Sequence, residues 1–188
     1  SAAFYMAQFI SLLRYSPQFT RKPLEIASRL NAYFATGVKD RQIFVTSVIG
    51  ILDTKAHTIK FVRTGHTPPI ILPGKMDENI TEVSSGGLGI GLTKTGETFN
   101  KTLKEKTVRL KPGDIFVLYT DGVIEAVRAT NTEHPEVFGE EQFHEILNKV
   151  RNYDANEIER SVSGALKDFY GTHAPVDDFT LLIIQRTN

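Results

Sequence analysis

The chain has 188 residues, of which 40% are hydrophobic, and its 22 Lys and Arg residues balance its 22 Asp and Glu residues. This length and apolar content suit one globular domain, and the zero net charge excludes a long-range attraction to nucleic acid or to an anionic membrane surface. Cysteine is absent, which excludes disulfides and thiolate metal sites and fits a cytoplasmic location.

The first part of the sequence predicts two helices. Residues Ala2–Tyr15 are apolar apart from one narrow polar stripe, so we expect a helix that is buried on most sides, between layers or at a subunit contact. Pro23 suits the first turn of a second helix, which ends at Gly37. No apolar run is long enough to span a bilayer, so no membrane insertion is expected.

The middle of the chain predicts an antiparallel sheet region. Runs of β-branched and aromatic residues indicate strands at Phe44–Leu52, Thr58–Arg63, Ile70–Leu72, Thr107–Leu110 and Ile115–Tyr119. The turn KPGD joins the last two runs. The glycine-rich segment SSGGLGIGL lacks the strand and helix context of a dinucleotide site and the Lys of a P-loop, which indicates a turning loop.

Helices return toward the end of the sequence. Phe143–Val150 has helical apolar spacing, and Asp154 is a predicted cap for a helix that ends at Gly171. The run Phe179–Gln185 is continuously apolar, so we expect a strand buried on both faces. Helices on both sides of an antiparallel middle predict a layered α+β sandwich.

Acidic residues stand at the ends of two predicted strands. Asp121 follows the strand IFVLY, and Gly122 permits a sharp turn there, although Asp-Gly is also an ordinary turn dipeptide. Asp177 and Asp178 precede the last strand, where they could be merely solvated. If the two strands are antiparallel neighbours, these carboxylates meet at one rim and offer oxygen ligands to Mg²⁺ or Mn²⁺.

His66 lies in the segment RTGHTPP, an ordered turn that leaves a predicted strand. A lone histidine is usually structural, with hydrogen bonds to backbone groups. A direct catalytic role for His66 is the alternative interpretation.

Several segments, in this order, resemble the SpoIIE-type branch of the PPM (type 2C-like) metal-dependent serine/threonine protein phosphatases. They are SAAFYMAQFISLLRY, FVTSVIGILD, IKFVRTGHTPPIIL, GGLGIGL, LKPGDIFVLYTDGVIEA and DDFTLLII. The resemblance covers nearly the whole chain, and the combination of these motifs is specific. It implies a four-layer α-β-β-α sandwich of two antiparallel sheets flanked by helices, with two Mn²⁺ or Mg²⁺ ions between the sheets.

The resemblance also assigns roles to residues. It implies that Asp121 and Asp177 are metal ligands and act in catalysis through a metal-bound water, which would attack phosphorus without a covalent enzyme intermediate. It places the backbone of Gly122 beside the metals, makes Asp178 a further ligand candidate, and makes Thr180 a supporting residue.

The chain departs from the family pattern at its start, because an acidic motif resembling GDVSGxG has no counterpart in it. We therefore expect residues 1–188 to be a single phosphatase domain that lacks its first strands and this first acidic motif. Two carboxylates are few for two cations that prefer six oxygen ligands, so this polypeptide alone should bind metal weakly and have low activity. By resemblance, an upstream sensor domain is expected in the full protein.

The leading functional hypothesis is a bacterial signal-transduction phosphatase. It would remove phosphate from phosphoserine or phosphothreonine on a regulatory protein in sigma factor regulation, such as an anti-sigma-factor antagonist. The alternative is a non-catalytic module of the same fold that binds a phosphoprotein or forms a homodimer. The presence of Asp121 and Asp177 favours the enzyme, and an α+β domain without a phosphate role is the third interpretation.

Overall fold

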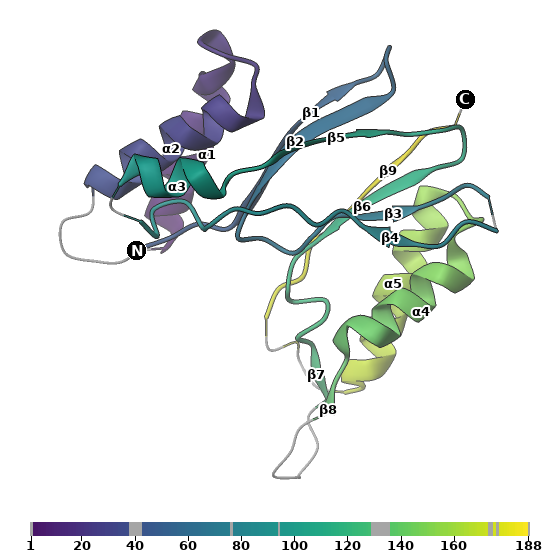
Figure 1. Ribbon diagram of the computed structural model, residues 1–188. Helices are drawn as coiled ribbons and strands as arrows, with labels where there is room; N and C mark the ends of the chain where they lie inside the picture. Colours follow the sequence, from purple (N-terminus) through teal and green to yellow (C-terminus); the bar gives the residue numbers. More distant parts are fainter. Residues whose placement is uncertain are drawn as a thin grey trace. The chain divides into compact units, whose positions relative to one another are not determined.

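The computed structural model describes residues 2–37, 43–75, 77–93, 95–128, 136–172, 175 and 177–187. The chain divides into two compact units (Figure 1). The first unit is formed by Ser1–His66 with Ser85–Arg109, and the second by Thr67–Ser84 with Leu110–Asn188. The expectation that the whole chain acts as one domain stays a prediction.

The first unit combines an antiparallel sheet with helices from both of its chain segments. Its helices are α1 (Ala2–Tyr15), the short 3₁₀ helix η1 (Ser16–Gln18), α2 (Pro23–Gly37) and α3 (Gly96–Thr102). Its strands are β1 (Ser47–Asp53), β2 (Thr58–Thr64) and β5 (Glu105–Arg109), in the order β1-β2-β5. The bounds of both predicted N-terminal helices are confirmed, whereas α3 was not predicted.

The core of the first unit is built on α2, which buries its apolar side against the sheet. Ile26, Leu30 and Phe34 of α2 are buried in one cluster with Ile49 and Val62 of the strands. This arrangement follows from the helical spacing of the apolar residues in α2.

Within this chain α1 is buried on one side only, and the expected burial at a subunit contact stays a prediction. Phe9 of α1 is buried, with 6% of its surface exposed, but Phe4 is 61% exposed and Met6 is 55% exposed. The helix contributes one side to the core of the first unit, through Phe9 and the partly buried Leu12 among others. Its remaining apolar side chains lie on the surface.

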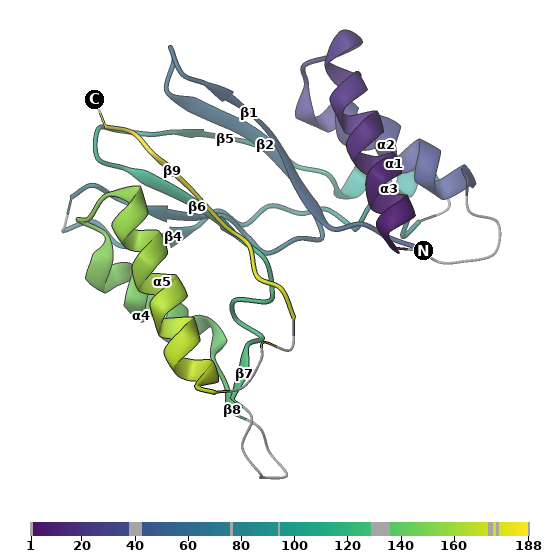
Figure 2. The same ribbon diagram turned by 180° about the vertical axis from the view of Figure 1, so that it is seen from behind.

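The second unit is a four-stranded antiparallel sheet with two long helices and a small ribbon. The sheet has the order β4-β3-β6-β9, with β3 (Ile70–Leu72), β4 (Thr81–Glu82), β6 (Ile115–Tyr119) and β9 (Leu181–Gln185). The helices α4 (Gly139–Val150) and α5 (Ala155–Tyr170) lie side by side along it (Figure 2). The ribbon pairs β7 (Val127–Arg128) with β8 (Glu136–Val137).

The helices of the second unit have strongly one-sided sequences, and this explains their packing. Phe143 and Leu147 of α4 and Ile158 and Val162 of α5 are fully buried in one core. The predicted cap of α5 is confirmed, because the Asp154 carboxylate accepts hydrogen bonds from the backbone N–H groups of residues 156 and 157, at 2.8 and 2.9 Å.

The last strand differs from its prediction. It begins at Leu181 and lies at the edge of the sheet, where Leu181 and Ile183 pack against the helical core while Leu182 is 47% exposed. An edge strand has a neighbouring strand on one side only, so its side chains are covered less than those of a central strand. The expectation of burial on both faces is therefore wrong.

The α+β class, with antiparallel sheets and helices, is confirmed. No helix within the described ranges is long and apolar enough to cross a membrane.

Candidate metal centre

The first acidic motif lies where the chain leaves β6. Strand β6 ends at Tyr119, and a turn follows in which Asp121 O accepts a hydrogen bond from Glu125 N at 2.8 Å. Gly122 N donates to Asp121 Oδ1 at 3.1 Å. The side chain of Asp121 is exposed, so the turn presents a carboxylate to solvent at the end of a buried strand.

The second acidic motif lies where the chain approaches β9. Strands β6 and β9 are antiparallel neighbours, and their last pair is Tyr119 with Leu181. The end of β6 is therefore next to the start of β9, which confirms the predicted arrangement. Asp177 and Asp178 are both exposed, and Asp178 N donates to Asp177 Oδ1 at 2.8 Å.

Gly122 brings the two motifs into direct contact. A Cβ atom at this position would lie 2.4 Å from Asp178 O and 3.3 Å from Phe179 Cα. Real Cβ atoms do not approach a backbone oxygen so closely, and only glycine leaves room for this contact. Asp121, Gly122, Asp177 and Asp178 thus form one surface feature, which we call the acidic rim.

Among the described residues, no Lys or Arg neutralises the charges of the acidic rim. In the described part of the chain, no Lys or Arg side chain forms an ion pair with its three aspartates. Burial raises the pKa of the nearby Tyr170, and the charge of Asp177 raises it further, so this phenol stays neutral beside the rim. Carboxylates in such a position would be stabilised by a bound cation.

The acidic rim fits part of a site for a hard divalent cation. Exposed carboxylate oxygens are the ligands that Mg²⁺ and Mn²⁺ prefer. Within the described residues, however, no group of three or more His, Asp or Glu side chains could hold a metal ion by itself. Asp121 and Asp177 would therefore need further oxygen ligands, and their assignment as ligands stays a prediction.

His66 belongs to the first unit, whereas the acidic rim belongs to the second. Its backbone oxygen accepts a hydrogen bond from Arg63 Nη1 at 2.5 Å, and Arg63 Nε donates to Ser85 O at 2.8 Å. These bonds give the GHTPP turn an ordered backbone, as its sequence predicts. A catalytic role for the His66 side chain stays a prediction.

Two threonines beside the acidic rim were missed by the sequence analysis. Thr67 Oγ1 donates to Tyr119 O at the end of β6. Thr120 Oγ1 accepts from Thr180 N at 2.8 Å, and Thr120 N donates to Thr180 O at 3.0 Å. Their position next to a predicted strand end could have indicated this role, because a threonine hydroxyl commonly forms hydrogen bonds with nearby backbone groups.

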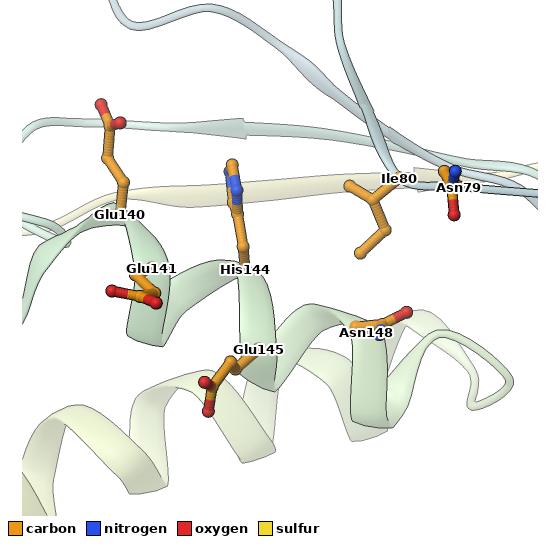
Figure 3. A pocket seen from close by; sticks show the side chains of 7 residues that line it. All are labelled: Asn79, Ile80, Glu140, Glu141, His144, Glu145 and Asn148. Carbon is orange, nitrogen blue, oxygen red and sulfur yellow. The ribbon is translucent and has the colours of Figure 1, made fainter.

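A separate groove of about 620 Å³ follows α4 in the second unit (Figure 3). It is lined by Asn79, Ile80, Glu140, Glu141, His144, Glu145 and Asn148. His144 Nε2 lies 3.2 Å from Glu82 Oε1. Under α4, burial raises the pKa of Tyr119 to about 12, with smaller contributions from the Glu82 and Glu140 charges. None of the acidic-rim residues lines this groove.

Comparison with known proteins identifies relatives across nearly the whole chain. The family model described as Stage II sporulation protein E (SpoIIE) matches residues 1–187. Protein IcfG of Synechocystis sp. is 27% identical over 157 residues, which are 83% of this chain and 23% of that protein. Phosphoserine phosphatase RsbU of Bacillus subtilis is 24% identical over 186 residues, which are 94% of this chain and 50% of that protein. The chain thus spans half or less of the length of these two relatives.

Solved structures share the fold. The SiaA-PP2C domain of Pseudomonas aeruginosa matches with a TM-score of 0.75 and 18% identity, over 93% of this chain and 66% of that chain. The RsbU and RsbW domains of a Mycobacterium tuberculosis protein match with a TM-score of 0.73 and 24% identity, over 99% and 48%. The PP2C phosphatase domain of SpoIIE from Bacillus subtilis, with a fragment of its regulatory domain, matches with a TM-score of 0.69 and 20% identity. The match covers 96% of this chain and 49% of that chain.

Proposed function

The chain belongs to the SpoIIE family, and on this premise we propose that it forms part of a metal-dependent serine/threonine protein phosphatase. The observation that carries the proposal is the contact between the two acidic motifs at Gly122. It gathers exposed carboxylates from two distant segments on one rim, and no Lys or Arg in the described part of the chain forms an ion pair with them.

The residues of the acidic rim would have distinct tasks. Asp121 and Asp177 would hold Mn²⁺ or Mg²⁺ through their carboxylate oxygens, and Asp178 is a further oxygen donor. Gly122 would keep a side chain away from the ions and keep the two motifs in contact. Two bound ions would supply phosphate binding and would lower the pKa of a coordinated water. Further oxygen ligands would be water molecules, backbone carbonyls or carboxylates of other residues.

The proposed substrate is a phosphoserine or phosphothreonine on a regulatory protein, such as an anti-sigma-factor antagonist. This step is supported by the relative named phosphoserine phosphatase RsbU and by the protein that carries RsbU and RsbW domains together. A cytoplasmic bacterial signalling protein with an upstream sensor domain would suit this role. A homodimer would offer one way to cover the exposed Phe4 and Met6 of α1.

The competing function is a non-catalytic module that binds a phosphoprotein. Such a module would have no use for cation-binding carboxylates, so metal binding and phosphate release separate the two functions. The test uses the full-length protein, with Mn²⁺ titrated in a calorimeter and phosphate release measured on an aryl phosphate and on phosphoserine proteins. Asp121→Asn and Asp177→Asn keep the side-chain size and remove the charge.

We expect each of these two variants to bind Mn²⁺ at least about tenfold more weakly and to lose phosphate release. Their metal-free melting temperature should be unchanged or higher, because one of the mutually repelling carboxylates is removed. Asp53→Asn in the β1–β2 turn is the matched control and should behave as wild type. Unchanged Mn²⁺ binding in both rim variants would refute the ligand assignment, and Mn²⁺ binding without any phosphate release would favour the binding module.

A further inference from the structure

The GHTPP turn contacts the strand that carries the first acidic motif, and it does so through Thr67. On the β3 side of β6, backbone pairing ends with Ile70 opposite Val117. Two residues further along β6, the half-buried Thr67 donates its hydroxyl to Tyr119 O. This side-chain bond continues the attachment of β6 beyond the point where the backbone ladder stops on that side.

The opposite side of β6 has a corresponding attachment. Backbone pairing with β9 ends with Tyr119 opposite Leu181. The next residue, Thr120, receives the Thr180 N–H on its Oγ1 at 2.8 Å and donates its own N–H to Thr180 O at 3.0 Å. A side-chain hydroxyl and one backbone hydrogen bond together extend the pairing on this side, and the residue that follows is Asp121.

Strand ends fray when their hydrogen bonds are incomplete. Fraying at this end of β6 would move Asp121 and Gly122 relative to Asp178, whose backbone oxygen is in contact with Gly122. A metal site needs its ligands held within a fraction of an ångström. The two threonine hydroxyls therefore hold the end of β6, where a small displacement of the backbone would move Asp121 and Gly122 of the acidic rim.

We propose that Thr67 and Thr120 are positioning residues, a threonine clamp that holds the exit of β6 from both sides and so fixes Asp121 against the Asp177–Asp178 segment. The proposal rests on the proposed metal-dependent function. It gives the GHTPP turn a role that is independent of the His66 side chain.

The test compares hydroxyl removal with hydroxyl retention in the full-length protein. Thr67→Val and Thr120→Val keep the volume and remove the hydroxyl, whereas Thr67→Ser and Thr120→Ser keep it. Thr107→Val, at an exposed position of β5 in the first unit, is the matched control. In calorimetric titration with Mn²⁺, we expect each Val variant to bind about tenfold more weakly, as is typical when a group that orients a ligand is lost.

The Ser variants and Thr107→Val should bind Mn²⁺ as the wild type does. Phosphate release by the Val variants should recover at saturating Mn²⁺, because the clamp affects ligand placement and not the reacting groups. A Val variant that melts at a lower temperature but binds Mn²⁺ as the wild type does would overturn the proposal. A Ser variant that binds as weakly as its Val counterpart would overturn it as well.

Hydrogen exchange on the metal-free wild type provides a test that does not depend on folding of the variants. The Thr180 amide, which is bonded to Thr120 Oγ1, should exchange as slowly as the amides of the paired β6–β9 segment. Exchange as fast as in an exposed loop would overturn the clamp. A wild-type protein with a slowly exchanging Thr180 amide but no Mn²⁺ binding would contradict the proposed function and leave the clamp as a structural device only.

Discussion

Helix α1 of the first unit is buried to a much smaller extent than the two long helices of the second unit. In the second unit, α4 and α5 each place one apolar stripe into the core, and Phe143 and Ile158 are completely buried. In the first unit, α1 is apolar around most of its circumference, yet it buries Phe9 and leaves Phe4 exposed. A helix with apolar residues on one side only thus indicates which of its faces is buried. A helix that is apolar on most sides does not indicate which of its faces packs against the core.

The largest expected effect lies in the core of the second unit. Phe143 has no exposed surface, and its ring centroid is 4.8 Å from that of Tyr119. Phe143→Ala should reduce the free energy of unfolding by about 3–5 kcal/mol, because it leaves a cavity under α4. Urea denaturation followed by circular dichroism measures this loss. A loss below about 1 kcal/mol would mean that the core of the second unit is not closed as described.

The matched pair in α1 tests the first unit. Phe9 packs against Phe34, with ring centroids 6.0 Å apart, so Phe9→Ala should reduce the free energy of unfolding by about 2–3 kcal/mol. Phe4→Ala should change it by less than about 0.5 kcal/mol, since the side chain is mostly in solvent. The same denaturation experiment applies. Equal losses in the two variants would show that α1 is covered in solution on both sides.

Several elements of the fold were predicted correctly from the sequence. The helix from Pro23 to Gly37 and the strand Ile115–Tyr119 were predicted with correct bounds, because a starting proline, a terminal glycine and a β-branched run are local signals. The adjacency of the strands next to Asp121 and Asp177 was predicted as well, from the assumption that these strands are antiparallel neighbours, whereas the role of the two carboxylates stays a prediction. Chain order alone was enough to suggest that arrangement, and the β6–β9 register confirms it.

Other features depend on contacts that no local pattern encodes. The exposure of Leu182 follows from the position of β9 at a sheet edge, which the apolar run does not reveal. The bond from Thr67 to Tyr119 exists only because of the register between β3 and β6. Helix α3 was missed because it is short and begins at Gly96, which is a poor helix former.

A smaller effect is expected at the helix caps, which also differ between the units. Asp154 accepts two backbone hydrogen bonds at the start of α5, so Asp154→Ala should lower stability by about 1 kcal/mol. The Thr95 cap of α3 in the first unit accepts from Thr98 N at 3.4 Å, a longer bond, and Thr95→Ala should cost less. Thermal melts of the two variants give the order. The reverse order would contradict the difference in cap geometry.

The smallest effect concerns the start of α2 and depends on pH. The hydrogen bond and charge of Lys22, together with the hydroxyl of Thr20, hold the pKa of Glu25 below its usual value. Because the folded-state pKa is the lower one, Glu25 stabilises the protein above its unfolded-state pKa, and this contribution disappears as the pH falls through the folded-state pKa.

Glu25→Gln should therefore be slightly less stable than wild type at neutral pH and equally stable in acid. The difference should be small, because both partners of the Lys22 pair are exposed and screened by solvent. Thermal melts across this pH range, with an NMR titration of the carboxyl group, measure it. A stability difference that grows toward acid would reverse the assigned sign.

The interleaved order of the two units has a consequence for the newly made protein. The segments of the first unit that lie within residues 1–188 have all been synthesised once Arg109 has been added. The sheet of the second unit is completed by β9, which is synthesised after β6, pairs with it and follows the second acidic motif. Until then β6 offers an unpaired edge that invites aggregation. A nascent chain thus acquires its acidic rim only after β9 has been made, and a premature stop before Leu181 would leave β6 without the strand that completes the rim.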